Sequence, residues 1–490
     1  MIIVITLAIY IIAMIGIGIF YSKRASDSES EYYLGGRSMG PLVTAVASGS
    51  TGRSAWLILG MVGTGYMFGA GAIWSVAVYA LTEMFAMGYA GKRLRIFTEK
   101  MNNLTWPDYM ESRLGDKTNM LRITSVLIIV VFYICYIGAQ LKGSTKMFSF
   151  LFDMQPVHAI VLSAVVVMIY TMTGGYRAVM MTSFIQGLLM VVSLVILPLF
   201  LLFTNLGTGI VDRIMAIEPM LLNSPTGTAS SSWLTGQLLV GLGSWGQIHI
   251  LTRYMSTKKV SEMSGAAFGN GCWNVICATG ACFTGLFARL IWDSADKLPN
   301  GDPELITVVM SSQLMNPIIG GIIIAGVVSA IMSTIDQLLL TTTSAITKDV
   351  YQSILNKEAS ERSVVSLSRI IMVVCSAIAI LIALSDSQTI YWFVLFAFGG
   401  LGAAFGPIFI LSTYWKGMTK WGAFVGMLVG LVVTVYWYYT PSLKSMIYEL
   451  VPAFTLAVIA NVVVSKLTAK DIPADVDELF DSLRTFKDKE

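Results

Sequence analysis

Apolar runs of about 20 residues alternate with short polar stretches along most of this chain. A helix needs roughly 20 predominantly apolar residues to cross a bilayer, and the period-two alternation of a porin-type strand is not seen in these runs. The pattern therefore predicts an all-α polytopic membrane protein with about thirteen transmembrane helices. We place them near residues 2–22, 42–64, 70–91, 120–150, 156–175, 178–205, 233–252, 261–291, 315–346, 364–384, 388–413, 421–440 and 445–466.

Composition supports this class. Of the 490 residues, 55% are hydrophobic and 12% are charged, far from the balance of a soluble domain. The net charge of +3 is small and its basic residues lie in loops, so the partners are the lipid bilayer and a small-molecule substrate, with no nucleic acid. We predict a single transmembrane domain over residues 1–466, followed by a charged cytoplasmic tail at 467–490.

Basic residues are concentrated in alternate loops, those that follow the odd-numbered helices. By the positive-inside rule these loops are cytoplasmic, which places the N-terminus outside and the C-terminus in the cytoplasm. We therefore expect a multi-pass protein of the cytoplasmic (inner) membrane. The residues that fix this orientation are Lys23, Arg24, Arg37, Lys92, Arg93, Arg95, Lys100, Arg177, Arg253, Lys258, Lys259, Lys348, Lys357, Arg362, Lys416 and Lys420.

Arg53 lies inside an otherwise apolar segment, residues 42–63. A charge at mid-bilayer depth costs about 2.5–3.5 kcal/mol on insertion scales, so it is expected to face a cavity or a partner. The segment is also rich in Gly, Ser and Thr, a composition suited to a helix that breaks around a ligand. Arg53 therefore marks a candidate site.

A second glycine-interrupted segment lies at residues 233–252, where Gly241, Gly243 and Gly246 accompany Ser244 and Gln247. The two segments open two five-helix halves, at about 42–205 and 233–413. This placement predicts an inverted repeat with its ligand site at the breaks. The simpler alternative is that the glycines only allow close helix packing.

The chain carries no recognisable catalytic or metal motif. All five cysteines lie in apolar runs with no zinc or redox spacing, and only two histidines are present. No HExxH, GxSxG or phosphate-binding loop occurs. We therefore predict a protein that is not an enzyme and has no prosthetic cofactor.

Several motifs, in order and spacing, make the chain resemble the sodium:solute symporter family, most closely its sodium/proline symporter branch. The resemblance implies a LeuT-type 5+5 inverted repeat over helices 2–11, with helices 2 and 7 broken. It also implies secondary transport of a small organic solute by alternating access, normally driven by sodium. The motifs are residues 33–41 (YLGGRSMGP), 54–57 (SAWL), 104–109 (LTWPDY), 170–171 (YT), 174–175 (GG), 246–247 (GQ), 249–251 (HIL), 332–334 (MST), 344–347 (SAIT) and 402–407 (GAAFGP).

The resemblance also implies a sodium site between helices 2 and 9. It would use the backbone carbonyls at Ser50, Arg53 and Ala330 and the hydroxyls of Ser333 and Thr334. Three positions depart from the family pattern. Gly52 and Ser183 stand where acids are expected, and Asp336 stands where the proline symporter has a small hydroxyl residue.

These departures leave three interpretations of Arg53. In the first, Arg53 pairs with Asp336 and locks helix 2 to helix 9. In the second, its guanidinium replaces sodium, which makes transport sodium-independent or proton-coupled through Asp336. In the third, it binds a substrate carboxylate through two hydrogen bonds. Na⁺ is thus the expected coupling ion and H⁺ the alternative.

Two further charges lie in predicted helices. Glu83 in helix 3 is expected to form an ion pair between helices, and Lys142 in helix 4 is expected to reach the outer interface. The alternative for both is a contact in the substrate pathway.

By the same resemblance, helices 2, 4 and 7 line the substrate pocket. Val240, Ser244 and Ile248 stand where the proline symporter has tryptophan, tyrosine and proline, so we expect a roomier, more polar pocket that argues against proline. A carboxylate-bearing amino acid or organic acid suits Arg53, and a neutral solute is the alternative. A membrane sensor or a channel is a less favoured function. The substrate-binding candidates are Arg53, Trp56, Tyr136 (or Cys135), Gln140, Ser244 and Gln247.

Overall fold

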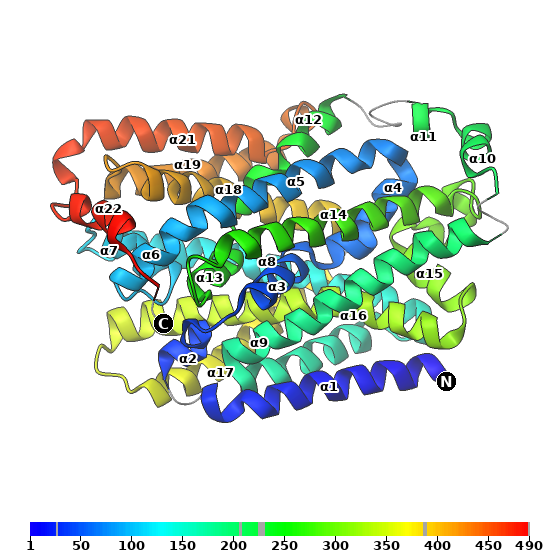
Figure 1. The fold of residues 1–490 in the computed structure, drawn as a ribbon, viewed down its shortest axis with the longest axis horizontal. Helices are drawn as coiled ribbons and strands as arrows, with labels where there is room; N and C mark the ends of the chain where they lie inside the picture. Colours follow the sequence, from blue (N-terminus) through cyan, green and yellow to red (C-terminus); the bar gives the residue numbers. More distant parts are fainter. Residues whose placement is uncertain (26–27, 205–207, 224–230, 386–389, 489–490) are drawn as a thin grey trace.

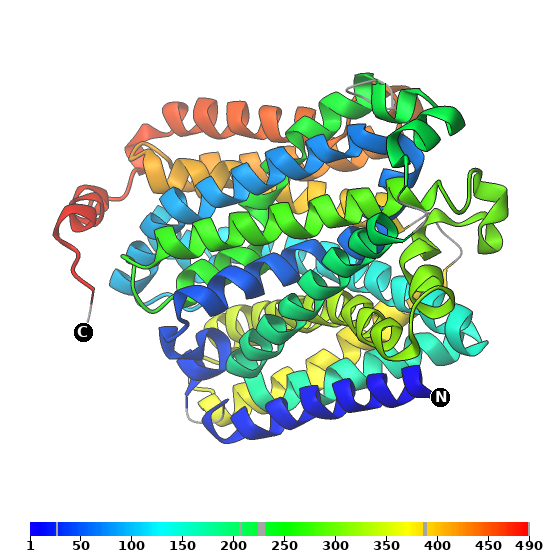
Figure 2. The same ribbon diagram turned by 45° about the vertical axis from the view of Figure 1, so that its right-hand side comes forward.

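The computed structural model describes residues 1–25, 28–204, 208–223, 231–385 and 390–488. Most helices run along one common axis and form an elongated bundle (Figures 1 and 2). The start of α1 and the C-terminal helix α22 lie at opposite ends of this bundle (Figure 1). In the first half the helices are α1 (Ile2–Ala25), α2 (Glu29–Leu34), α3 (Pro41–Ala55), α4 (Val62–Phe68), α5 (Ile73–Phe85), α6 (Lys92–Lys100), α7 (Trp106–Leu114), α8 (Met120–Phe152), α9 (Pro156–Phe203), α10 (Ile210–Ile217) and α11 (Met220–Asn223).

The second half continues the same architecture, and α19 and α21 pack beside α18 at one side of the bundle. Its helices are α12 (Ser231–Leu239), α13 (Ile248–Ser256), α14 (Met263–Ala288), α15 (Ile306–Gln313), α16 (Pro317–Ser344), α17 (Glu361–Leu384), α18 (Ile390–Tyr414), α19 (Lys420–Tyr439), α20 (Pro441–Lys444), α21 (Leu450–Leu467) and α22 (Val476–Thr485). Stretches of π-helix follow α3, α5 and α16, at η2 (Trp56–Met61), η4 (Ala86–Gly91) and η10 (Ala345–Leu355). A 3-10 stretch, η6 (Val240–Gly246), follows α12.

The predicted all-helical membrane fold is confirmed. Within the described residues, ten helical stretches are long and apolar enough to cross a membrane. One of them, Pro41–Lys100, contains two of the predicted segments, which are separated by Gly69 at a left-handed φ of 65°. The count of thirteen crossings and the orientation of the termini therefore stay predictions.

Both helices predicted to break are interrupted. In α3, Ser54 has φ 53° and ψ −166°, a conformation outside the helical region. The second break is a short 3-10 stretch, η6, followed by Gln247 at φ −80° and ψ 96° before α13 begins. A further kink lies in α9, where the φ of Gly175 is 58°, and it divides that helix at the boundary predicted between residues 175 and 178.

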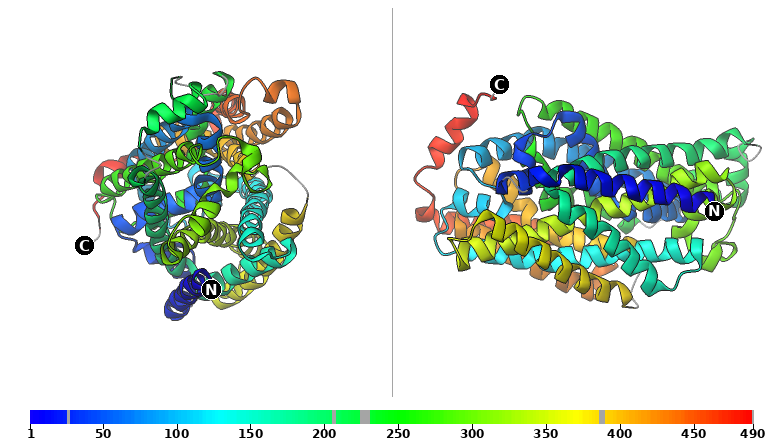
Figure 3. Two further views of the ribbon diagram at one scale, coloured as in Figure 1. Left: turned by 90° about the vertical axis from the view of Figure 1, so that its right-hand side faces the viewer. Right: turned by 90° about the horizontal axis from the view of Figure 1, so that it is seen from below.

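The two broken helices lie inside the bundle. The first, α3, packs against α9, α14 and α16, while η6 packs against α18 and α5. In the end-on view the remaining helices surround this interior (Figure 3). Close approach of η6 to α18 depends on small residues, because a Cβ on Gly402 would lie 2.5 Å from the Cα of Gly243.

Candidate substrate and cation site

Arg53 is held by two polar side chains and one ring. Its Nε donates to Asn274 Oδ1 at 2.7 Å, and one terminal nitrogen lies 3.4 Å from Glu83 Oε2. The guanidinium carbon lies 3.2 Å from the centroid of the Tyr79 ring, which is a cation–π contact. Asn274 also donates to Glu83 Oε2 at 2.8 Å, so the amide joins the two charges. The side chain of Arg53 therefore points to α5 and α14.

The predicted pairing of Arg53 with Asp336 is wrong in this structure. Glu83 is only 1% exposed and Arg53 only 3%, so each supplies the countercharge that the other needs when buried. Asp336, on α16, instead accepts a hydrogen bond from the Tyr170 hydroxyl at 3.0 Å. The sequence contained a signal for the observed pair, because Glu83 is an acid inside an apolar segment of the same half as Arg53.

Glu83 also explains the glycine at position 52. A Cβ placed on Gly52 would lie 3.6 Å from Glu83 Oε1. The family pattern expects an acid at position 52, and here a carboxylate reaches the same space from α5. An aspartate at position 52 would put two carboxylates side by side, which is unfavourable in a buried site.

The break in α3 is stabilised by side chains from α8. The Gln140 side-chain oxygen accepts from the Ala55 N–H at 2.9 Å, and Tyr136 donates to the Ser54 hydroxyl at 3.3 Å. The same hydroxyl accepts from the Trp56 N–H at 3.2 Å. A non-glycine residue with positive φ costs about 1–3 kcal/mol, and these three bonds offset that cost.

A narrow pocket adjoins this break. Trp56 and Tyr136 line it, as expected for substrate-binding residues. Tyr79 and Phe398, whose ring centroids lie 5.7 Å apart, form another part of its wall. The full lining is Gly52, Trp56, Tyr79, Tyr136, Val240, Val394, Leu395 and Phe398.

The pocket is more aromatic than the sequence suggested. Ser244 and Gln247 are absent from its lining, and both side chains bond within the protein. Ser244 donates to the Gly241 carbonyl at 2.7 Å, while Gln247 donates to the carbonyls of Gly243 and Phe398. Aromatic walls come from α5, α8 and α18 rather than from the second broken helix. The polar contribution expected from Ser244 is therefore not found in this lining.

Four of the residues predicted for the sodium site, Ser50, Ala330, Ser333 and Thr334, lie together, whereas the Arg53 carbonyl accepts from the Trp56 N–H. Ser333 donates to the Ser50 carbonyl at 3.4 Å, and Thr334 donates to the Thr51 carbonyl at 2.9 Å. Both hydroxyls also point at the Ala330 carbonyl, at 3.3 and 3.2 Å. Carbonyls of an unwound helix together with hydroxyls form the kind of oxygen cage that binds Na⁺ in such folds. The residues present fit a sodium ion.

Arg253 is the residue that the sequence interpretation misplaced. We assigned it to a loop because the apolar pattern ends at residue 252, but α13 continues to Ser256 and the Arg253 side chain is fully buried. It donates to the hydroxyls of Thr51 and, at 3.2 Å, Ser183. The cation nearest the predicted sodium ligands thus comes from α13 and not from Arg53.

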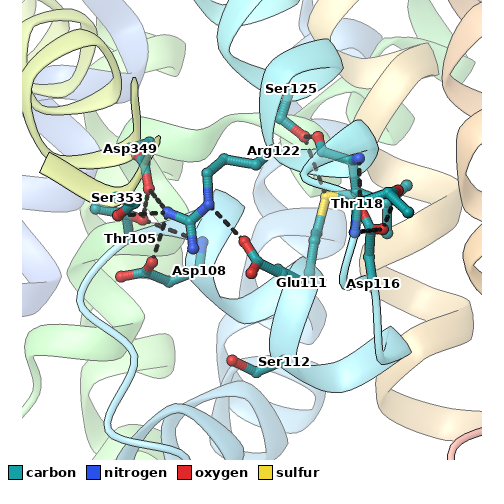
Figure 4. A network of polar contacts seen from close by, with 12 residues as sticks. Thr105, Asp108, Glu111, Ser112, Asp116, Thr118, Arg122, Ser125, Asp349 and Ser353 are labelled. Atoms are coloured by element: carbon teal, nitrogen blue, oxygen red, sulfur yellow. Dashed lines mark hydrogen bonds and ion pairs between the residues drawn. The ribbon is translucent and has the colours of Figure 1, made fainter. Parts of the chain in front are cut away.

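An ion-pair network lies at the end of the bundle opposite the start of α1 (Figure 4). Arg122, at the beginning of α8, contacts Asp108 Oδ1 and Asp349 Oδ1 at 2.8 Å and Glu111 Oε2 at 2.5 Å. It ties α7 and η10 to α8. A small cavity lined by residues of α13 also includes Asp349 in its lining.

Comparisons with known proteins agree with this geometry. The model of the sodium:solute symporter family matches residues 32–430. The high-affinity proline transporter PutP of Bacillus subtilis is 35% identical over 471 residues, which cover 96% of this chain and 98% of the relative. A sodium/proline symporter of Staphylococcus aureus is 35% identical over 493 residues, with 98% and 96% covered.

Solved structures share the fold. A Na⁺-coupled sialic acid symporter, substrate-bound and outward-open, superposes with a TM-score of 0.79 at 21% identity, covering 95% of this chain and 98% of its own. MhsT in complex with L-phenylalanine gives a TM-score of 0.55 at 15% identity, covering 87% and 98%. The protein is a membrane transporter and not an enzyme. It belongs to the sodium:solute symporter family.

Proposed function

We propose that this protein transports a small zwitterionic amino acid together with Na⁺ by alternating access. One observation supports the proposal: the residues of α3 beside its break at Ser54 lie both at the pocket and at the proposed cation ligands. Gly52 and Trp56 line the pocket, while the carbonyls of Ser50 and Thr51 meet Ser333 and Thr334 of α16. Any movement of this segment changes the solute pocket and the cation cage at once, which is what coupled transport requires.

The charges around the pocket favour a carboxylate-bearing solute without net charge. The half-helix that begins after Ser54 directs the positive end of its dipole at the pocket. One terminal nitrogen of Arg53 is buried and has no hydrogen-bond partner among the described residues. Because Glu83 already neutralises Arg53, an amino acid zwitterion is favoured over an organic acid with a net negative charge.

Proline is the first solute to test. The argument against it from Val240, Ser244 and Ile248 assumed lost aromatic walls, whereas the pocket has four aromatic side chains. Relatives 35% identical over nearly their whole length are proline transporters. A ring of proline's size packs well between such apolar surfaces.

Na⁺ is the coupling ion that the site supports. Asn274 and Glu83 hold the Arg53 side chain toward α5 and α14, so its guanidinium does not replace the cation between α3 and α16. The proposed ligands are the carbonyls at Ser50, Arg53 and Ala330 and the hydroxyls of Ser333 and Thr334. Proton coupling through an Arg53–Asp336 pair loses its structural basis.

Uptake of radiolabelled proline and other amino acids into proteoliposomes tests the proposal. We expect uptake against a gradient only with an inward Na⁺ gradient, and an imposed proton gradient should not replace it. Thr334→Ala should raise the half-saturating Na⁺ concentration about tenfold. The matched control Thr343→Ala removes a buried α16 hydroxyl that bonds only to its own helix and should leave it unchanged. Uptake that is equal with and without Na⁺ would refute the coupling.

A further inference from the structure

Arg253 and Asp336 are two buried charges of opposite sign beside the proposed sodium site. Both side chains are fully buried, Arg253 on α13 and Asp336 on α16. The Arg253 Nε and the Asp336 Oδ1 have no hydrogen-bond partner among the described residues. They form no ion pair with each other within the described part of the chain.

Arg253 is linked to the cation cage through one residue, Thr51. The Thr51 hydroxyl accepts from the Arg253 guanidinium and donates to the Ser333 carbonyl at 3.0 Å. The Thr51 carbonyl accepts from the Thr334 hydroxyl. The guanidinium therefore lies one side chain away from the two residues whose hydroxyls are proposed to bind Na⁺.

Asp336 is close to the same ligands along the chain. It follows Ser333 by three residues on α16, a spacing that places both side chains on one face of the helix, and the Tyr170 hydroxyl from α9 donates to its other oxygen. Ser183, whose hydroxyl accepts from Arg253 at 3.2 Å, stands where the family pattern expects an acid. The negative charge that could balance Arg253 is therefore supplied from α16 instead of α9.

We propose that Arg253 and Asp336 act as an opposed pair that sets the Na⁺ affinity of this site. The Arg253 charge disfavours a bound cation, the Asp336 charge favours it, and together they leave the surroundings of the cage neutral. The proposal rests on the sodium site proposed above. Charges in a buried environment are little screened, so the removal of either should change cation affinity strongly.

This pair makes a prediction that a merely structural pair does not. Two residues that only stabilise the fold would both weaken Na⁺ binding, or leave it unchanged, when either is neutralised. Opposed electrostatic roles instead require shifts of opposite sign. Arg253→Gln should lower the half-saturating Na⁺ concentration, Asp336→Asn should raise it, and the double variant should return near the wild-type value.

The test is a titration of thermal stability with NaCl in purified full-length protein, with choline chloride holding the ionic strength constant. A ligand that binds the folded state raises the melting temperature, so the titration reports Na⁺ affinity without requiring transport. We expect a shift of about fivefold or more for each single variant, a typical coupling between neighbouring charges. Arg253→Lys keeps the charge and should stay within about threefold of wild type; it also serves if Arg253→Gln does not fold.

Two further variants separate the possible failures. Arg289→Gln removes a partly buried arginine at α14 that bonds to the Tyr66 carbonyl, and it should leave Na⁺ affinity unchanged. Thr334→Ala should weaken Na⁺ binding. If it does so while Arg253→Gln and Asp336→Asn shift affinity in the same direction or not at all, the charge-pair proposal is overturned and the sodium site stands. If Thr334→Ala has no effect, the sodium site and this inference both fall.

Discussion

Neutralising one member of the Arg53–Glu83 pair should destabilise the protein strongly. The closest charged atoms are 3.4 Å apart, which corresponds to an attraction of about 5 kcal/mol at an effective dielectric constant near 20. The pair also bears the cost of removing both charges from water, so its net contribution is smaller. Removing one partner leaves the other charge buried and uncompensated, and such changes cost about 3–5 kcal/mol.

We expect Arg53→Met at the lower end of this range, because Glu83 keeps the hydrogen bond from Asn274. Glu83→Gln should cost a similar amount, since the guanidinium keeps the Asn274 oxygen and the Tyr79 ring. The double variant Arg53→Met/Glu83→Gln buries no charge and should lose about as much as one single variant. This outcome corresponds to a coupling energy of about 2–3 kcal/mol.

Denaturant unfolding in mild detergent, followed by intrinsic tryptophan fluorescence, measures the free energy of unfolding for all four proteins. Uptake of radiolabelled amino acid should fall for Arg53→Met, because Arg53 adjoins the pocket through Gly52. The double variant tells whether Arg53 acts on substrate directly: its stability should be no lower than that of Arg53→Met, while uptake should stay low. Additive losses in the double variant would refute the pairing, and full uptake in Arg53→Met would refute the proposed role in binding.

Two other predictions concern the ends of the bundle. Arg122→Gln should lower the free energy of unfolding by about 3 kcal/mol and speed hydrogen exchange in α7 and η10, because three carboxylates lose their shared cation. Lys416→Gln, at an exposed ion pair, should lower it by less than about 1 kcal/mol. Equal effects of the two substitutions would contradict this reasoning. Burial raises the pKa of Glu449, just before α21, to about 7 from 4.5. Between these two pKa values the folded state binds more protons than the unfolded state. The free energy of unfolding should therefore fall by about 3 kcal/mol from pH 4.5 to pH 8. Glu449→Gln should remove this component of the pH profile.

The fold could be predicted because its signals are spread along the chain. Apolar runs marked the helices, and the clusters of Gly, Ser and Thr in α3 and of Gly in η6 marked the two breaks that the structure shows. The end of α13 could not be found this way. Arg253 terminates the apolar pattern, yet the helix continues and buries it, since Thr51 and Ser183 supply acceptors from other helices. Hydropathy cannot register partners that lie far away in sequence.

The cation cage could be carried over from the family pattern because it depends on backbone carbonyls and two hydroxyls. These groups need only the break in α3 and its contact with α16. The pairing of charges could not. Arg53 had two candidate acids, Glu83 and Asp336, and the choice depended on the direction of a side chain in the folded bundle. Asn274, which bridges the chosen pair, gave no distinguishing signal in the sequence.

The two acids missing from the family pattern show why such pairings vary. At the first position a carboxylate approaches from another helix, because Glu83 Oε1 of α5 would lie 3.6 Å from a Cβ on Gly52; at the second, the Ser183 hydroxyl accepts from the buried Arg253. Electrical neutrality of a buried region depends on the charges within a volume and not on the helix that carries them. A family can therefore keep its cation cage fixed while the surrounding acids move between helices. Residue-by-residue transfer brought most of the proposed ligands together in this structure but not the charges around them, and we therefore expect Na⁺ affinity to depend on charges that the family pattern does not predict.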